Sequence, residues 1–452
     1  MHEVVTIETP SLGDRSYLIH DGSTAVVVDP QRDIDRIVNA AESSQVRIAL
    51  VLETHIHNDY VTGGRALAEA AGAGYLVAAT EDVSFQRTPA RDGDKFSFGT
   101  LAVSAVSTPG HTPGHLSYVL REAGGQPTAV FTGGSMLYGA VGRTDLIGPD
   151  QTESLTRAQY RSVRRLADEL PDDVAVYPTH GFGSFCSATP TSGTSSTIGL
   201  QRRVNVALTS DEEDFVKDLI VGLAAYPAYY AHMGAANRGG PSAPDLAAPR
   251  VAGPAELRRR LQAGEWVVDL RQRRAFARSH VTESISVELG DSFATYLGWV
   301  MRWGTPLTLI GDSAGQVAEA QRQLTRIGID RLQAAATGGT DELAGGRLSS
   351  YPVSDFAALA ARWGQDGIVA VDVRRPDEWQ AGHIAGAVHI PFWEVEARTG
   401  EVPQGQVWVY CASGLRASIA ASLLDRAGRH VVHVDDNWER AAQLGLPVTT
   451  SG

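Results

Sequence analysis

The first 200 residues alternate short apolar runs with polar turn segments, a pattern that predicts strands joined by tight turns. The apolar runs predict strands at residues 3–8, 16–20, 24–29, 48–53, 101–107, 116–120, 129–132 and 174–177. Apolar residues at helical spacing predict helices at 34–43, 64–71 and 152–170. This mixture of strands and helices indicates an α/β sandwich.

The next segment, 211–233, is apolar on one helical face and predicts a single further helix. It is followed by ANRGGPSAPDLAAPR, a stretch rich in Gly, Pro and Ala that is typical of a linker and runs to about Arg250. We therefore expect a domain boundary between residues 240 and 252.

An internal repeat lies beyond this linker. Residues 267–287 can be laid over residues 370–390 without a gap, at a constant offset of 103 residues. Asp269 then matches Asp372, Arg271 matches Arg374, Phe276 matches Trp379 and His280 matches His383. Several chemically specific matches at one offset predict two homologous domains, 252–347 and 352–452, after an amino-terminal domain 1–240. Alternating strands and helices in each half are typical of a parallel α/β sheet.

Histidines gather at predicted strand ends in the amino-terminal domain. His55, His57 and Asp59 alternate in THIHNDY directly after an apolar strand, and His111 and His180 each follow a later strand. Side chains at the carboxyl ends of strands converge at one edge of a sheet. Imidazole and carboxylate groups are suitable ligands for Zn, Fe or Mn, so these five residues predict a metal site.

The carboxyl-terminal domain holds the chain's best candidate nucleophile. Cys411 lies between the apolar strand QVWVY and the helical segment SIAASLLDRAG, with Arg416 five residues later. Backbone N–H groups and the helix dipole at such a turn stabilise a thiolate, and a positive Arg416 adds to this effect. In the first repeat Asp312 takes the place of the cysteine, and a carboxylate cannot replace a thiolate as a nucleophile for sulfur. We expect at most one such cysteine centre, and we interpret the other cysteine, Cys186, as a packed thiol.

Composition narrows the function classes. The 452-residue chain has a formal net charge of −13 and two cysteines, with no apolar run long enough to cross a bilayer. Two cysteines exclude a disulfide framework and a Cys-rich metal cluster, and the acidic balance disfavours nucleic-acid binding. The amino terminus has no export signal, so we expect a cytoplasmic protein with neither membrane nor nucleic-acid partners, and a homo-oligomer stays open.

The histidine motifs carry a family resemblance. HxHxD after a strand, TPGHTPGH, FTGG, GRTD and a final YPTH resemble the metallo-β-lactamase fold, an αββα sandwich, and within it the persulfide dioxygenases and the glyoxalase II thioesterases. The GRTD tetrapeptide favours the dioxygenases. The resemblance implies one iron held by His55, His111 and residue 134, and an Arg143 that contacts the thiol carrier. Two positions depart from the family pattern, because Tyr60 stands for a histidine and Gly134 for an aspartate. His55, His57 and His111 can still hold one ion, with Asp59 and His180 nearby.

The segment from Cys411 to Arg416 has the pattern Cys-x4-Arg, and we call it the cysteine loop. Together with Asp372, Arg374 and DEWQAGHIAGAVHIP, it resembles the rhodanese sulfurtransferases over nearly all of residues 352–450. In that family the loop cysteine carries the transferred sulfur, which implies Cys411 as the catalytic residue here and Arg416 as a substrate-binding one. The first repeat is then an inactive rhodanese-like domain.

Both resemblances imply one substrate class. The sequence thus predicts an enzyme that oxidises a small thiol persulfide, of glutathione or another low-molecular-weight thiol, at one transition metal. Fe(II) is the first choice and Zn the second, and Cys411 exchanges sulfur with a thiol or sulfite, giving thiosulfate. Two alternatives remain open: a sulfurtransferase with a metal-free amino-terminal binding module, and a zinc thioester hydrolase resembling glyoxalase II.

Overall fold

The computed structural model describes residues 2–122, 124–189, 191 and 193–450. The chain divides into two compact units. The first contains Met1–Pro244 and Thr325–Gly328, and the second contains Asp245–Leu324 and Ile329–Gly452. Among the described residues, no helix combines the length and the apolar character of a membrane-spanning segment.

Two six-stranded sheets form the centre of the first unit. The first sheet has the order β1 (Glu3–Thr9), β2 (Asp14–His20), β3 (Thr24–Val28), β4 (Arg47–Leu52), β5 (Gly74–Ala78) and β6 (Thr88–Ala90). The second has the order β12 (Ser196–Thr197), β11 (Ala175–Pro178), β10 (Pro127–Gly133), β9 (Leu116–Arg121), β8 (Leu101–Ser107) and β7 (Lys95–Phe98). All eight strands predicted from the apolar runs are confirmed.

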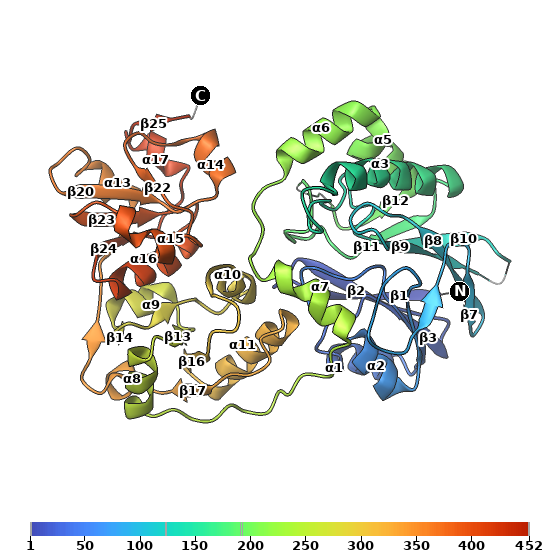
Figure 1. Cartoon of the computed structure of the whole chain (residues 1–452), viewed down its shortest axis with the longest axis horizontal. Helices are drawn as coiled ribbons and strands as arrows, with labels where there is room; N and C mark the ends of the chain where they lie inside the picture. The colour runs from blue at the N-terminus through green and yellow to red at the C-terminus, as the bar shows by residue number, and fades with distance from the viewer. Residues whose placement is uncertain (1, 123, 190, 192, 451–452) are drawn as a thin grey trace. The chain divides into compact units, whose positions relative to one another are not determined.

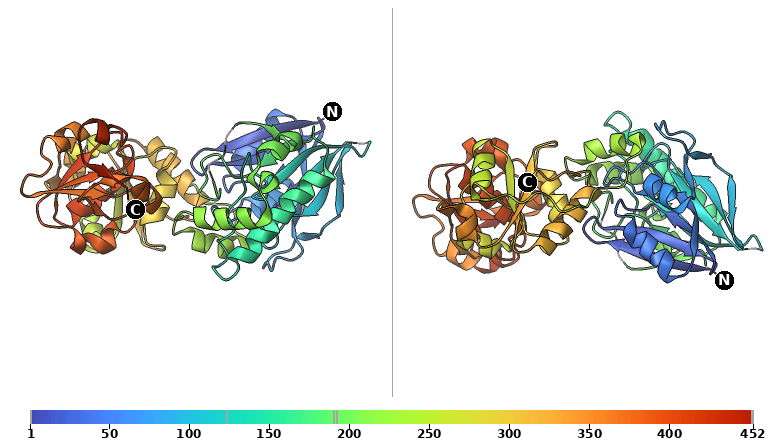
Figure 2. Two further views of the ribbon diagram at one scale, coloured as in Figure 1. Left: turned by 90° about the horizontal axis from the view of Figure 1, so that it is seen from above. Right: turned by 90° about the horizontal axis from the view of Figure 1, so that it is seen from below.

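Helices cover the outer face of each sheet, while the inner faces pack on each other. Tyr17, Val26 and Leu52 of the first sheet meet Tyr118 and Phe131 of the second in one buried apolar cluster. Helices α1 (Asp35–Ser43) and α2 (Gly64–Ala71) lie outside the first sheet, and α3 (Thr152–Glu169) lies outside the second (Figure 1). Figure 2 shows α3 facing the viewer from above and α1 and α2 from below. The unit is therefore the αββα sandwich that the sequence predicts.

The predicted single helix 211–233 is wrong. The segment forms α6 (Glu212–Gly222) and α7 (Tyr230–Gly239), separated by residues 223–229. Pro227 explains the break, because proline lacks an amide hydrogen and disfavours helical conformation in the residue before it. Two short helices, α4 (Ile198–Val204) and α5 (Val206–Thr209), precede this pair.

The second unit contains two separate, mainly parallel sheets. The first has the order β15 (Ile285–Ser286), β13 (Trp266–Asp269), β16 (Leu307–Gly311) and β17 (Ala334–Thr337). The second has the order β19 (Val353–Ser354), β24 (His430–Val434), β23 (Gln406–Tyr410), β20 (Ile368–Asp372) and β22 (Val388–His389). The helices around them are α8 (Pro254–Gln262), α9 (Arg273–Arg278), α10 (Phe293–Val300), α11 (Ala314–Arg326), α12 (Thr340–Ala344), α13 (Phe356–Ala360), α14 (Pro376–Ala381), α15 (Val395–Arg398), α16 (Leu415–Arg426) and α17 (Arg440–Gln443). Two small strand pairs complete the unit: β14 (His280–Val281) with β18 (Leu348–Ser349), and β21 (His383–Ile384) with β25 (Val448–Thr449).

The internal repeat is visible as repeated contacts. Arg271 forms a two-pronged ion pair with Asp269 and donates to the carbonyl of Ser279. Arg374 does the same with Asp372 and the carbonyl of Gly382, each 103 residues later. His280 stacks on Phe276 at 3.9 Å between ring centroids, and His383 stacks on Trp379 at 3.5 Å. The matched residues therefore have the same structural roles in both halves.

The two compact units can be tested separately, because all eight tryptophans lie between residues 266 and 438, within the second unit. Phe131 and Phe356 are fully buried, Phe131 between the sheets of the first unit and Phe356 in the core of the second. We expect Phe131→Ala to lower the free energy of unfolding by about 3–5 kcal/mol in urea titrations followed by circular dichroism, with the tryptophan fluorescence transition unchanged. The matched Phe356→Ala variant should shift the fluorescence transition. A fluorescence shift in Phe131→Ala would show that the units do not unfold separately.

Candidate functional site

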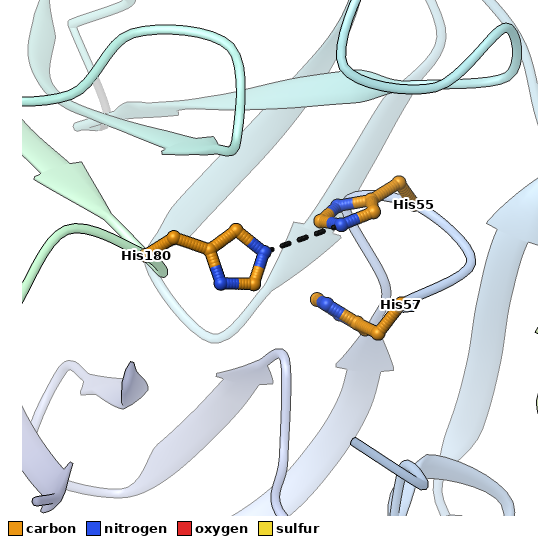
Figure 3. A group of neighbouring side chains, drawn as sticks. All are labelled: His55, His57 and His180. Atoms are coloured by element: carbon orange, nitrogen blue, oxygen red, sulfur yellow. Dashed lines mark hydrogen bonds between the residues drawn. The ribbon is translucent and has the colours of Figure 1, made fainter. Parts of the chain in front are cut away.

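The candidate metal ligands lie in loops at the carboxyl ends of strands from both sheets. His55, His57 and Asp59 follow β4, and His180 follows β11. His111 comes from the loop between β8 and β9. All five are fully buried or nearly so. Figure 3 shows the rings of His55, His57 and His180 turned toward one another.

Three of these histidines share one orientation. The Nδ1 atom of His55 contacts Thr54 Oγ1 at 2.9 Å, that of His111 contacts the carbonyl of Arg143 at 2.7 Å, and that of His180 contacts Asp14 at 2.9 Å. An Nδ1–H held by an oxygen leaves Nε2 with a free lone pair, as in metal-binding histidines. The Nε2 atoms of His55 and His180 lie 3.3 Å apart, and Nε2 of buried His111 has no hydrogen-bond partner among the described residues.

His57 has different surroundings. Its Nε2 lies 2.9 Å from the Tyr60 hydroxyl and 3.3 Å from a carboxylate oxygen of each of Asp29 and Glu53. Burial works against a charged imidazole, but Asp29 and Glu53 outweigh it and raise the pKa of His57 to about 9. Tyr60 thus contacts His57, and the remaining ring atom of His57, Nδ1, has no partner among the described residues.

Two carboxylates support His180. Its Nδ1 lies 2.9 Å from Asp14 and 3.1 Å from Asp59. Burial opposes protonation, but Asp59 and Asp14 outweigh it and raise the pKa of His180 well above its ordinary value. Burial, together with the charge of Asp59, raises the pKa of Asp14 to about 7. Asp59, predicted as a ligand, therefore lies against the side of His180 that carries Nδ1.

Gly134 lies where the family resemblance implies a carboxylate ligand. A Cβ atom added at Gly134 would lie 2.3–2.8 Å from the ring atoms of His111. The backbone N–H of Gly134 donates to Nε2 of His115 at 3.0 Å, and Nδ1 of His115 contacts Thr108. The His111 ring thus occupies the space of a side chain at position 134, and no carboxylate fits there unless His111 moves.

Arg143 is buried and held by the protein. Its guanidinium makes two 2.7 Å contacts with Asp145 and donates to the carbonyls of Phe185 and Ala224. It also lies over the ring of Tyr226 at 4.4 Å. These contacts give Arg143 a structural role, and its contact with a thiol carrier stays a prediction.

The histidines fit one metal ion. Two nitrogens bound to a tetrahedral ion at about 2.0–2.1 Å lie roughly 3.3–3.4 Å apart, close to the 3.3 Å between Nε2 of His55 and His180. The ligand atoms of His55, His57 and His180 all lie within 4.8 Å of one another. Nε2 of buried His111, which has no hydrogen-bond partner among the described residues, offers a further lone pair. The residues present therefore suit an ion held mainly by imidazole.

The cysteine loop of the second unit has the predicted form. Cys411 follows β23, and Gly414, with a φ of 91°, is the N-cap residue directly before α16. The Cys411 Sγ accepts the backbone N–H groups of Gly414 at 3.2 Å and Ala417 at 3.3 Å. Two N–H donors at a helix N-terminus suit a thiolate or a persulfide anion on this sulfur.

Arg416 is paired with an acid. Its guanidinium lies 2.5 and 2.8 Å from the two carboxylate oxygens of Glu378, on α14. Burial disfavours charge on both groups, but the pair lowers the pKa of Glu378 and raises that of Arg416. The positive charge predicted beside Cys411 is thus partly offset, and a role of Arg416 in substrate binding stays a prediction.

The cysteine-less repeat supports the cysteine loop. Arg273 and Arg274 of α9 contact Asp435 at 2.8 and 2.5 Å. A Cβ at Gly414 would lie 2.2 Å from a carboxylate oxygen of Asp435, so Asp435 packs directly on the loop. A cavity of about 470 Å³ lies here, lined by Gln272, Arg273, Arg274, Glu288, Ser413, Asp435, Asp436 and Asn437.

Several residues near the histidines and near Arg416 were not predicted from the sequence. Asp14, Asp29, Glu53 and His115 surround the histidines, and Glu378 pairs with Arg416. Position at a strand end could have indicated Asp29 and Glu53, since each is the last residue of a predicted strand and directly follows an observed one, β3 or β4. Asp14 begins β2, and its contact with His180 joins residues 166 positions apart, for which a single sequence carries no signal.

The packing of Gly134 gives a stability prediction. We expect Gly134→Ala to lower the free energy of unfolding of the first unit by about 1–3 kcal/mol, because the added methyl overlaps the His111 ring. Urea titration followed by circular dichroism measures it. Gly222→Ala is the control, since a Cβ there meets no atom within 4 Å. An equal penalty for Gly134→Ala in a His111→Ala background would contradict the assignment to that ring.

The contacts of Asp435 give a pH prediction. Burial opposes its charge, but Arg273 and Arg274 outweigh it and lower the pKa of Asp435. A lowered folded-state pKa contributes stability that is present above about pH 4 and is lost as the pH falls through the folded value. The Arg273→Met/Arg274→Met variant should therefore unfold at lower urea than the parent at pH 7, followed by tryptophan fluorescence, with the difference shrinking below about pH 4. Arg278→Met, on the same helix, is the exposed control. A difference that persists unchanged in acid would contradict the charge-based account.

Comparisons with known proteins match two segments of the chain to two families. Residues 14–180 match the metallo-beta-lactamase superfamily, and residues 355–443 match the rhodanese-like domain. The human mitochondrial persulfide dioxygenase ETHE1 is 30% identical over 213 residues, which are 46% of this chain and 73% of that protein. A hydroxyacylglutathione hydrolase of Cereibacter sphaeroides is 32% identical over 189 residues, 40% of this chain and 67% of that protein.

One solved structure extends over both units. The crystal structure of a metallo-beta-lactamase from Staphylococcus aureus has a TM-score of 0.66 and 26% identity, covering 75% of this chain and 99% of that one. The persulfide dioxygenase and rhodanese relationships both indicate sulfur metabolism at the family level. The chain therefore belongs to the metallo-beta-lactamase superfamily, as a relative of the persulfide dioxygenases that also carries a carboxyl-terminal rhodanese-like domain.

Proposed function

We propose that this enzyme oxidises a low-molecular-weight thiol persulfide at a single metal ion in the first unit and transfers sulfane sulfur through Cys411. The observation that carries the proposal is the set of buried Nε2 atoms of His55, His111 and His180, each fixed by an oxygen on Nδ1. The relatedness to persulfide dioxygenases supports the same substrate class.

The first reaction converts R–S–SH, O₂ and H₂O into R–SH, sulfite and two protons. The outer sulfur is oxidised, oxygen is reduced, and the S–S bond is cleaved. A redox-active ion such as Fe(II), held by the histidines, would supply the electron transfer to oxygen, whereas Zn²⁺ has no redox chemistry. Asp14 and Asp59 hold His180 by Nδ1, and Thr54 holds His55, so the protein fixes the donor atoms in advance. The burial of these side chains excludes bulk water from the site.

The second reaction uses the cysteine loop. The Cys411 thiolate attacks the outer sulfur of R–S–SH, the S–S bond breaks, and R–S⁻ leaves, so that Cys411 carries the sulfur as a persulfide. Sulfite then attacks that outer sulfur, which releases thiosulfate and returns the thiolate. The N–H groups of Gly414 and Ala417 point at Sγ and stabilise its negative charge before and after each transfer. Glutathione or another small thiol is the proposed carrier.

Two observations favour a different function for the first unit. Asp29 and Glu53 raise the pKa of His57, a predicted ligand, to about 9, and the His111 ring fills the space for a carboxylate at Gly134. These features suit a metal-free binding module joined to a sulfurtransferase. A zinc thioester hydrolase with two ions is less well supported, because a bridging carboxylate at position 134 is missing.

The test measures both reactions on one preparation. Iron-loaded full-length protein given glutathione persulfide should consume O₂, down to one O₂ per two persulfides when Cys411 converts all the sulfite to thiosulfate. Cys411→Ser should consume one O₂ per persulfide and lose nearly all thiosulfate formation from persulfide and added sulfite. The Cys186→Ser variant controls for the loss of a thiol outside the loop in the transfer assay. Sulfur transfer without oxygen uptake would refute the oxidation and leave the binding-module function. Transfer that survives Cys411→Ser would refute the role of Cys411.

A further inference from the structure

The histidine cluster holds a donor that the proposed function does not use. Cys186 is fully buried in the first unit, and its Sγ lies within 4.8 Å of the ligand atoms of both His111 and His180, which themselves lie within 4.8 Å of each other. We propose that Cys186 binds the metal ion as a thiolate together with His111 and His180, in the role that a carboxylate at position 134 would have. This inference rests on the proposed function, since it concerns the same ion.

Backbone pairing fixes Cys186 relative to His111. The N–H of Arg143 donates to the carbonyl of Cys186 at 2.8 Å, while the carbonyl of Arg143 accepts from Nδ1 of His111 at 2.7 Å. Ser187 pairs with Gly142 in an antiparallel bridge, and the N–H of Ala188 donates to Val141. The backbone of one residue, Arg143, therefore holds both Cys186 and His111, and these hydrogen bonds keep the two residues close together.

The second observation is an unpartnered nitrogen. Nε2 of His111 is buried and has no hydrogen-bond partner among the described residues. A buried polar atom left without a partner costs free energy, and a metal ion supplies that partner. His180 offers its Nε2 on the side away from Asp14 and Asp59, which contact Nδ1. One ring nitrogen of each of these two histidines and Sγ of Cys186 lie within 4.8 Å of one another.

Buried carboxylates near the Cys186 thiol favour the binding of a cation. The carboxylates of Asp14 and Asp59 are buried against His180, which groups with Cys186. When a divalent ion binds, the thiol proton leaves, and the thiolate and the nearby carboxylates offset the charge of the ion. A sulfur ligand also favours ions that accept soft donors, such as Fe²⁺, Co²⁺ and Zn²⁺, over Mg²⁺ and Ca²⁺.

Cobalt is a direct probe, because a thiolate on Co²⁺ gives a near-ultraviolet charge-transfer band that imidazole does not. The chain has two cysteines, so full-length Cys411→Ser protein retains only Cys186 as a thiol. Titrating its metal-free form with Co²⁺ without oxygen should produce the visible bands of bound cobalt and the charge-transfer band together, both saturating at one equivalent. The matched Cys186→Ser/Cys411→Ser protein should lose the charge-transfer band.

The outcomes separate this inference from the proposed function. Visible cobalt bands without the charge-transfer band in Cys411→Ser protein would overturn the thiolate ligand and leave the histidine site standing. No cobalt binding would overturn both. X-ray absorption at the cobalt edge of the Cys411→Ser protein decides the question even if the double variant fails to fold. We expect a sulfur neighbour at about 2.3 Å, and a shell of only nitrogen and oxygen at about 2.0–2.2 Å would overturn the inference.

Discussion

The structure of the first unit depends on charge compensation inside one buried cluster. Four carboxylates, of Asp14, Asp29, Glu53 and Asp59, and five histidines lie together where the strands of two sheets end, almost without exposure to solvent. Only two of these histidines, His57 and His180, have a raised pKa. Buried charges persist only when they are paired or when they bind a metal. The proposed divalent ion, held by His55, His111 and His180, would complete the compensation, and this is why we propose metal binding despite the missing carboxylate at Gly134.

The second unit stabilises a single negative charge, that of the Cys411 sulfur. A reactive sulfur needs donors that are fixed before the anion forms, and the turn into α16 provides two backbone N–H groups for Cys411. Asp435 packs against Gly414 in that turn and is itself held by Arg273 and Arg274 of the cysteine-less repeat. A domain without a nucleophile therefore helps to hold the loop that carries Cys411, the residue to which we assign the proposed sulfur transfer.

Short sequence patterns predicted most of the strands and helices. The residues that were not predicted mostly act through contacts with residues far away in the sequence. The eight strands could be predicted because each is a short apolar run bounded by turn residues, and the repeat because an Arg–Asp pair and a stacked His recur at one offset. The helix 211–233 was predicted without weighing Pro227, which breaks it into two. The histidines were found because they cluster in motifs. Asp14, which holds His180, and Asp435, which packs on Gly414, were not, because their roles arise only when the chain folds.

The central claim is that the histidine cluster binds one transition-metal ion. Elemental analysis of full-length protein purified without added metal tests it most directly, with a His55→Ala/His111→Ala variant prepared in parallel. The account predicts about one equivalent of a transition metal per chain, iron first and zinc second, and a loss of that metal in the variant. A parent protein that folds without bound metal, or that holds the same metal after both histidines are removed, would contradict it. Two equivalents of zinc would instead favour the thioester hydrolase.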